Sequence, residues 1–168
     1  MKISINQELP NATFYQMVGE EIKAVNLFEL TKKRNVVLVG MPGAFTNTCS
    51  SIHLPGLIEN SQKFFETGID EILCVVVNDV HVAKVWSDMS GAAEAGIKIL
   101  ADVDSNFTKS IGLEFSAPKV GFHNRLQRVA IIAKDNVVIH LQTEPDRGTC
   151  NRTSGTVLLK SVTELLKG

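Results

Sequence analysis

Short apolar runs alternate with longer segments of mixed polarity along most of the chain. The runs 36–40, 72–77 and 97–100 have the length and composition of buried strands. Each run is separated from the next by enough chain to hold a crossover helix. This alternation is typical of βαβ units and therefore predicts parallel strands in one sheet.

Three of the remaining segments predict helices. Residues 47–65 predict a helix that Pro55 should bend, because proline removes one hydrogen bond and clashes with the preceding turn. Residues 80–93 predict a second helix with apolar residues at helical spacing, namely Val82, Val85, Trp86 and Met89. Residues 154–167 predict a terminal helix with one apolar side, made of Leu158, Leu159, Val162, Leu165 and Leu166.

Two pairs of short apolar segments predict hairpins. Residues 12–17 and 21–28 flank a turn at 18–20, and residues 128–133 and 137–142 flank Lys134-Asp135-Asn136. A short helix is expected before the second hairpin. Together the elements predict an α/β fold with an N-terminal β-hairpin and a central mixed sheet flanked by helices.

Length and charge narrow the possible classes of protein. The 168 residues contain no repeat or linker, so a single domain over residues 1–168 is expected. The net charge of −1 gives no sign of a nucleic-acid partner, and Lys32-Lys33-Arg34 is interpreted as a solvated turn. No run approaches the roughly 18 apolar residues of a membrane span, so no membrane partner is expected. The first ten residues lack the apolar core of a signal peptide, which favours a cytoplasmic location.

Three widely spaced cysteines, Cys49, Cys74 and Cys150, do not resemble a secreted disulfide framework. Cys49 falls in the first turn of a predicted helix, where the helix dipole and free N–H groups favour a thiolate. Thr46 can cap this helix and direct its hydroxyl toward the sulfur or toward an oxygen substrate, and Pro42 can wall the site. The alternative is that Thr46 is only a cap and Cys49 only a buried apolar side chain.

The residues around Cys49 resemble a known family. Pro42, Thr46 and Cys49 match the Pro-x-x-x-Thr-x-x-Cys signature of peroxiredoxins, and PGAFTNTCSSIHLPG resembles the active-site loop of the type II subgroup. Further similarity to that subgroup lies in GIDEILCVVVNDVHVAKVW, ADVDSNFTKSIGLEF and RLQRVAIIAKDNVVIHLQTEPD. The resemblance implies a thioredoxin-like fold. It also implies a thiol peroxidase whose Cys49 is oxidised to a sulfenic acid by hydrogen peroxide or a small alkyl hydroperoxide.

The resemblance assigns roles to the neighbours of this cysteine. Thr46 would orient the peroxide, Pro42 would shield the sulfur, and the catalytic arginine of the family corresponds to Arg128. The charge of an arginine favours a thiolate, and its planar fork can donate to peroxide oxygens as negative charge develops on them. Arg125 is expected at the surface or in a dimer contact. No cofactor or metal is implied.

Two positions near Cys49 need a separate interpretation. Asn47 stands where many relatives have proline, and we expect it to loosen the first turn without removing a reactive group. His53 follows Cys49 by four residues, but two ligands do not make a zinc site. His53 matches the family's histidine in HLPG, so a structural hydrogen-bonding or helix-end role is expected. The remaining histidines are expected to be structural or exposed, namely His81, His123 and His140.

The sequence leaves open how the sulfenic acid is resolved. Cys74 resembles the resolving cysteine of plant type II peroxiredoxins, and Cys150 lies near the one used by the mammalian group. Either disulfide needs Cα atoms within about 7 Å, so the turn around Cys49 would have to unwind. In a third route an external thiol, from glutaredoxin, glutathione or thioredoxin, reduces Cys49 directly.

The resemblance also implies a homodimer, and it leaves a second class of function open. The alternative to a peroxidase is a peroxide-sensing redox switch or a chaperone-like binding module with little turnover, because a fold alone does not define an activity. A disulfide oxidoreductase of the thioredoxin kind would need a CxxC pair, which the sequence lacks.

Overall fold

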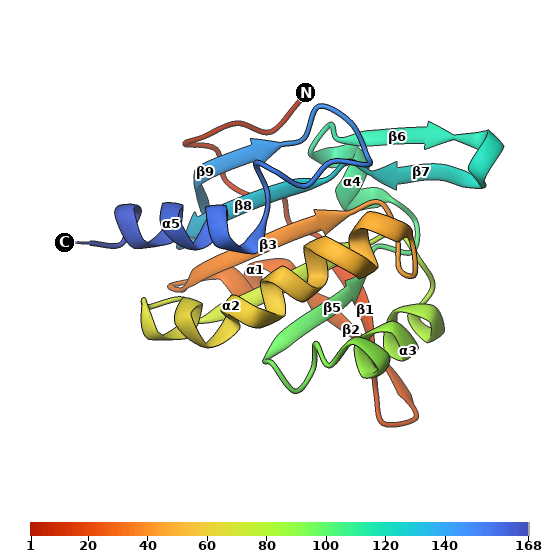
Figure 1. Cartoon of the computed structure of the whole chain (residues 1–168), viewed down its shortest axis with the longest axis horizontal. Coiled ribbons are helices and arrows are strands. Elements are labelled where there is room, and N and C mark those ends of the chain that lie inside the picture. The colour runs from red at the N-terminus through yellow and green to blue at the C-terminus, as the bar shows by residue number, and fades with distance from the viewer. Residues whose placement is uncertain (168) are drawn as a thin grey trace.

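The computed structural model describes residues 1–167 and is built around a seven-stranded mixed sheet of order β2-β1-β5-β4-β3-β8-β9 (Figure 1). Its strands are β1 (Thr13–Val18), β2 (Glu21–Asn26), β3 (Asn35–Met41), β4 (Glu71–Val76), β5 (Ile97–Ala101), β8 (Val129–Lys134) and β9 (Val137–Thr143). Strands β3, β4 and β5 are parallel, and the hairpins β1–β2 and β8–β9 add antiparallel strands at the two edges. The predicted mixed sheet with an N-terminal hairpin is confirmed.

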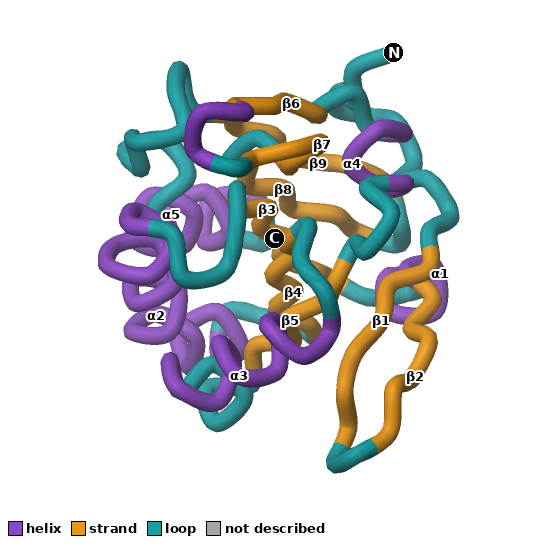
Figure 2. Tube along the Cα trace, turned by 90° about the vertical axis from the view of Figure 1, so that its right-hand side faces the viewer, coloured by secondary structure: helices purple, strands orange, loops and turns teal. Residues whose placement is uncertain are grey.

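Helices cover both faces of this sheet, as Figure 2 shows. One face carries the longer helices, α2 (Leu54–Glu66), α3 (Val80–Ser90) and α5 (Gly155–Leu165). The other face carries two short ones, α1 (Leu27–Thr31) and α4 (Asn106–Ser110). No helix within residues 1–167 is long and apolar enough to span a membrane.

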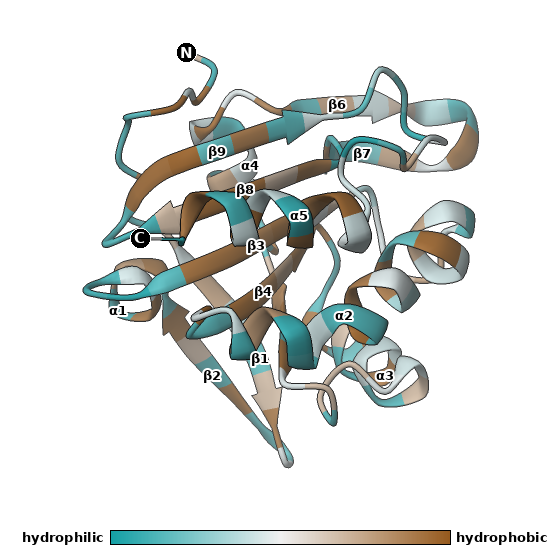
Figure 3. Cartoon of the chain, turned by 60° about the vertical axis from the view of Figure 1, so that its left-hand side comes forward, coloured by the Kyte–Doolittle hydropathy of each residue, from teal (hydrophilic) through white to brown (hydrophobic). Residues whose placement is uncertain are grey.

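The two cores follow from the period-two geometry of the strands. In β3, Val37 and Val39 pack under the longer helices, whereas Val36 and Leu38 pack against the short ones. Because both faces are covered, the strand is apolar throughout, and Figure 3 shows the hydrophobic central strands. The continuous apolar runs of the sequence therefore belong to the middle of the sheet.

The second predicted helix is shorter and packs differently from the expectation. It ends at Ser90 because Gly91 adopts a left-handed conformation with φ of 80°. Trp86 is buried, but Val85 and Met89 are 50% and 74% exposed. The predicted apolar spacing therefore does not describe one buried face.

A second small sheet lies in a region where only a short helix was expected. Strands β6 (Glu114–Ala117) and β7 (Phe122–Leu126) pair antiparallel around the 3-10 turn η2 (Pro118–Val120). β6 alternates exposed and half-buried residues over only four positions, and β7 does not alternate, so the sequence pattern is too short and irregular to predict this hairpin. Strand β7 leads directly to Arg128, and the missed hairpin therefore matters for the site.

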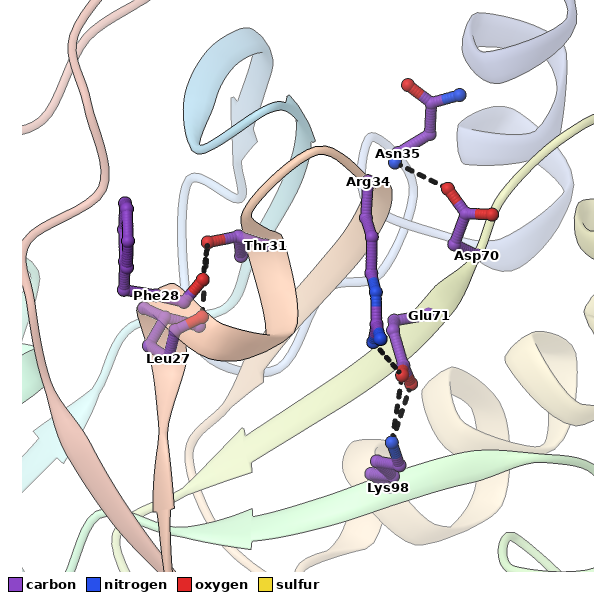
Figure 4. A network of polar contacts seen from close by, with 8 residues as sticks. All are labelled: Leu27, Phe28, Thr31, Arg34, Asn35, Asp70, Glu71 and Lys98. Atoms are coloured by element: carbon purple, nitrogen blue, oxygen red, sulfur yellow. Dashed lines mark hydrogen bonds and ion pairs between the residues drawn. The ribbon is translucent and has the colours of Figure 1, made fainter.

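The amino-terminal ends of the parallel strands carry a partly exposed ionic cluster, drawn in Figure 4. Glu71 lies between Arg34 and Lys98, at 2.8 Å from each. Asp70 accepts a hydrogen bond from the backbone of Asn35. Residues 32–34 are all exposed, which confirms the predicted solvated turn.

Close contact between α2 and α5 fixes the segment that precedes α5. A Cβ atom at Gly155 would overlap the carbonyl of Gly56 in α2, so only glycine allows this approach. The segment before Gly155 is thereby held against the start of α2, which directly follows the turn that contains Cys49.

Candidate active site

Cys49 opens a π-helical turn, η1 (Cys49–His53), that leads into α2. The N–H of Leu54 donates to the carbonyl of Cys49 five residues earlier, which widens the helix at this turn. Pro55 lies in the first turn of α2, where its missing N–H is tolerated. The expected irregularity therefore exists, but it lies in the turn before Pro55. The Cys49 side chain is fully buried at the carboxyl end of β3.

Arg128, between β7 and β8, is the side chain that faces this sulfur. Its Nη2 lies 3.3 Å from Cys49 Sγ and also donates to the carbonyl of Arg147 at 2.9 Å. Its Nη1 donates to His53 Nδ1 at 2.8 Å. Arg128 is only 2% exposed, and no carboxylate of residues 1–167 forms an ion pair with it. A buried cation without an acidic partner favours an anionic sulfur beside it.

His53 is buried between Arg128 and the backbone before α5. Its Nε2 lies 2.9 Å from the carbonyl of Thr153, so Nε2 carries the proton and Nδ1 accepts from Arg128. Burial, with the Arg128 charge added to it, lowers the pKa of His53 to about 3, so the ring is neutral. The predicted hydrogen-bonding role is present. Both ring nitrogens are occupied, which leaves no lone pair for a metal.

Thr46 contacts the loop before the helical turn instead of capping it. Its hydroxyl donates to the carbonyl of Gly43 at 2.7 Å, and within the described chain no backbone N–H donates to it. The oxygen lone pairs of Thr46 are therefore free toward the cavity that the residue lines. The expected cap is wrong, while the expected orientation of the hydroxyl toward a substrate stays a prediction.

A cavity of about 250 Å³ leads from the surface to Arg128. It is lined by Pro42, Thr46, Asn47, Thr48, Val120, Phe122, Arg128, Arg147 and Gly148. Its volume and its polar end suit a small oxygen-containing molecule. Within residues 1–167, no group of three or more His, Cys, Asp and Glu side chains could hold a metal ion.

Arg125, expected at the surface or in a dimer contact, lies partly at the surface and also contacts the loop before Cys49. It is half-buried, donates to the carbonyl of Pro42 at 2.9 Å and lies 4.9 Å from the ring centre of Phe122. Burial lowers the pKa of Arg125, and the charge of Cys49 opposes that shift. Arg125 therefore holds the loop that carries Pro42, a contact hidden from the sequence because β7 was not predicted.

The segment 144–153 closes the other side of the site, and the sequence did not single out its contacts. Thr48 donates to the carbonyl of Gly148 at 3.0 Å. Glu144 accepts hydrogen bonds from the backbone of Arg152 and Thr153. Burial alone would raise the pKa of Glu144, but these donors outweigh it and hold the pKa below its usual value. The segment is therefore anchored at both ends.

The two candidate resolving cysteines differ in accessibility. Cys150, within the anchored segment, is half-buried and lies 3.8 Å from Thr153 Oγ1, and burial raises the pKa of its thiol. Cys74 is fully buried in β4, opposite Val39 of β3, and burial raises the pKa of its thiol further. Cys150 thus lies in a loop outside the sheet, whereas Cys74 lies in a central strand between β3 and β5.

Other polar side chains near the site have supporting positions. Trp86 Nε1 donates to Ser50 Oγ at 3.1 Å and so ties α3 to the turn beside Cys49, a role that its apolar spacing did not indicate. Asn47 is exposed and accepts from Ser51 through its carbonyl. The other histidines are surface groups or half-buried, as expected: His81, His123 and His140.

A buried cysteine facing an arginine without an acidic partner, at the carboxyl end of a parallel strand, defines a thiol enzyme on a thioredoxin-like sheet. The profile of the Redoxin family matches residues 5–158. The chain is 37% identical over 164 residues to peroxiredoxin-2E-2, chloroplastic, of Oryza sativa, covering 95% of this chain and 72% of the relative.

Solved structures give the same result. Reduced Prx3 of Vibrio vulnificus in complex with hydrogen peroxide has a TM-score of 0.87 and 37% identity, over 95% of this chain and 96% of that one. Peroxiredoxin 5 of Alvinella pompejana has a TM-score of 0.84 and 28% identity, over 96% and 99%. The chain therefore belongs to the redoxin family and, within it, to the type II peroxiredoxins. It is a thiol peroxidase.

Proposed function

We propose that the Cys49 thiolate reduces hydrogen peroxide and small alkyl hydroperoxides. The sulfur attacks one peroxide oxygen, the O–O bond breaks, and Cys49 becomes a sulfenic acid. The leaving oxygen takes up a proton and departs as water or an alcohol. The observation that carries this proposal is the 3.3 Å contact between Cys49 Sγ and the buried guanidinium of Arg128.

Arg128 and Thr46 bind the peroxide in this reaction. Arg128 Nε is buried and has no hydrogen-bond partner among residues 1–167, so its N–H is available to a peroxide oxygen. Donation from this cation becomes stronger as negative charge grows on the leaving oxygen. Thr46 accepts the hydrogen bond of the peroxide O–H, and Pro42 shields the sulfur from other reactants.

Cys150 resolves the sulfenic acid. Its sulfur attacks Cys49, a disulfide forms, and the hydroxyl of the sulfenic acid leaves as water. The residue lies two positions after Gly148, whose carbonyl contacts the neighbour of Cys49, Thr48. A dithiol or thiol reductant, namely glutaredoxin, glutathione or thioredoxin, then reduces the disulfide. The alternatives to this route are resolution by Cys74 and direct reduction of Cys49 by an external thiol.

The working state is a cytoplasmic homodimer. Three exposed apolar residues lie on the active-site elements, Phe45, Ile52 and Val120, and a second copy of the chain would cover them. Sedimentation of the reduced protein at micromolar concentration tests the dimer, and a monomer overturns it. All three cysteines are free, which suits a reducing compartment, and cell fractionation tests this location.

The first experiment is the intact mass of the reduced protein after one equivalent of hydrogen peroxide, with peptide mapping of any new disulfide. Loss of two hydrogens, mapped to Cys49 and Cys150, is expected. Added oxygen on Cys49 without a disulfide means direct reduction by an external thiol. A Cys49–Cys74 disulfide means that the strand opens.

Turnover separates the peroxidase from a redox switch. Peroxide consumption is followed with each reductant in excess, using Cys49→Ser as the inactive variant and Cys74→Ser as the matched control. We expect sustained consumption that Cys49→Ser abolishes and Cys74→Ser leaves intact. Equal consumption by Cys49→Ser and the parent overturns the role of Cys49, and a single oxidation without turnover favours the switch.

A further inference from the structure

The orientation of Arg128 depends on three acceptors that surround its guanidinium. These are His53 Nδ1 on one terminal nitrogen, and Cys49 Sγ together with the Arg147 carbonyl on the other. An arginine side chain has four rotatable bonds, so a buried guanidinium keeps one orientation only where fixed acceptors hold it. Because the sulfur is the reacting atom, the other two acceptors must supply the orientation.

His53 can fill this role because its tautomer is fixed from the far side of the ring. An arginine can only donate, so Nδ1 must offer a lone pair, and the proton must be on Nε2. The Thr153 carbonyl accepts that Nε2 proton at 2.9 Å, and a carbonyl can never donate in return. The tautomer that accepts from Arg128 is therefore the one that Thr153 selects.

Both non-sulfur acceptors of Arg128 depend on one segment of chain, residues 147–153. Arg147 supplies its carbonyl directly, and Thr153 acts through His53. Glu144 fixes the end of this segment by accepting from the Thr153 backbone at 2.8 Å and the Thr153 hydroxyl at 2.9 Å. Cys150 lies between the two supports. The same segment thus contains Cys150 and also orients Arg128, which faces Cys49.

We propose that His53 is a positioning residue that holds Arg128 toward Cys49 and makes this orientation depend on the segment 147–153 that carries Cys150. This inference rests on the proposed role of Arg128 in the peroxidase reaction. The segment keeps Arg128 directed at Cys49 while it is docked. When the segment moves so that Cys150 reaches Cys49, the Thr153 and Arg147 carbonyls leave, and Arg128 is released.

Two substitutions separate the two sides of the ring. In His53→Asn the side-chain oxygen lies near the former Nδ1 and can still accept from Arg128. In His53→Gln the side-chain nitrogen lies near the former Nε2 and can still donate to Thr153, but the acceptor for Arg128 is lost. We expect His53→Gln to slow the reaction with hydrogen peroxide about tenfold, the effect of one charge-assisted hydrogen bond. His53→Asn should stay within about threefold of the parent, since that bond is retained.

The thiolate absorbance of reduced Cys49, followed in a pH titration, is the second readout and needs no peroxide. It is measured in a Cys74→Ser, Cys150→Ser background so that only one thiol contributes. His53→Gln should reduce the thiolate signal near neutral pH, and His53→Asn should largely restore it. The charged groups that face His53 or Cys49 and can change this signal are Arg128, Arg125 and Glu144, and all are retained in both variants.

A double-mutant cycle tests the dependence on the segment. Glu144→Ala removes the acceptor that holds Thr153 and should also lower the thiolate signal. In the His53→Gln background its effect should be clearly smaller, because the path through Thr153 and His53 is already broken and only the Arg147 carbonyl still links the segment to Arg128. Thr31→Val is the matched control, since Thr31 is a buried hydrogen-bonded residue on the opposite face of the sheet and should alter stability alone.

Each outcome separates this inference from the proposed function. The positioning role is wrong if His53→Gln and His53→Asn lose the peroxide rate and the thiolate signal equally while their melting temperatures equal that of Thr31→Val. The ring would then only fill space. Parent-like behaviour of both variants, or additive effects of Glu144→Ala, also overturns the positioning role. If the thiolate signal follows the expected pattern but the parent does not consume peroxide, the positioning role stands and the proposed function fails.

Discussion

An arginine lies at each end of the parallel strands. One is beside a carboxylate and the other is beside a cysteine that can ionise, and their surroundings differ. At the amino-terminal end, Arg34 and Lys98 pair with Glu71 in a partly exposed cluster (Figure 4). At the carboxyl end, Arg128 is buried against Cys49, with no carboxylate paired to it in the described chain. The first cluster contains a permanent anion, whereas the second gains one only when the sulfur is ionised.

This difference explains why one cluster supports the fold and the other supports chemistry. Glu71 is itself only 13% exposed, but its two cations are 44% and 39% exposed, so water reaches both pairs from the cation side and screens them. Arg128 instead lies in a low-dielectric site, where its charge acts strongly on the one anion that can form there. Equivalent substitutions at the two ends should therefore have very different effects.

The largest expected effect follows from replacing each arginine with lysine. Arg128→Lys should slow the reaction of Cys49 with hydrogen peroxide by about 10²–10³-fold, because one ammonium group cannot donate to His53, the sulfur and the peroxide together. Arg34→Lys should leave the rate unchanged, because the exposed pair with Glu71 tolerates a lysine. Stopped-flow measurement of peroxide consumption compares the two variants.

A rate for Arg128→Lys within about threefold of the parent would remove the contrast between the two ends, since a charge alone would then suffice. Circular dichroism at the assay temperature checks that the variant is folded. The methyl-ended isostere Arg128→Met, which lacks any charge, should be slower than Arg128→Lys, and the reverse order would contradict an electrostatic role.

Most of the sheet could be predicted because its strands are continuous apolar runs between segments of helix length. Residues 36–40 lie within β3, and the turn Asp135-Asn136 adopts the positive φ values of a tight hairpin. The β6–β7 hairpin could not be predicted, because it lies over the site with few buried residues. Its stability comes from contacts such as Arg125 with Pro42, which are distant in sequence.

The site could be predicted only in part for the same reason. Pro42, Thr46 and Cys49 occupy one short segment, so their spacing is visible in the sequence. The role of His53 depends on Arg128 and Thr153, which are separated from it by 75 and 100 residues. Such contacts follow from the topology of the sheet and not from local periodicity, so His53 was expected only to be a structural group.

The next expected effect is a pH dependence that distinguishes the buried end of the sheet. The pKa of His53 is about 3 in the folded chain, against a usual value of 6.5. Between these values the unfolded state binds the proton and the folded state does not. The free energy of unfolding should therefore fall as the pH is lowered through this window, by up to about 1.4 kcal/mol per pH unit.

Denaturant unfolding at several pH values measures this slope. The slope of the unfolding free energy against pH should be smaller in His53→Gln than in the parent between pH 6.5 and 3. Glutamine does not titrate, so the difference in proton binding between the folded and unfolded states is removed. His123→Gln, at an exposed position on β7, is the matched control and should keep the parent's slope. An unchanged slope in His53→Gln would mean that His53 does not stay neutral in the folded chain.

The smallest effect is expected from Glu71→Gln at the exposed end. The amide oxygen can still accept from Arg34 and Lys98, but the amide nitrogen replaces Oε2, which lies 2.8 Å from Lys98 Nζ, so the variant loses that ion pair together with the charge. The free energy of unfolding should fall by about 0.5–1 kcal/mol in low salt and by less in high salt, because ions screen exposed pairs. Denaturant unfolding at two salt concentrations measures this difference, with the peroxide rate expected to stay at the parent's value. A loss of several kcal/mol that did not depend on salt would mean that water does not screen the charge of Glu71. The environments of the two clusters would then be equally shielded from water, and the contrast drawn between them would be wrong.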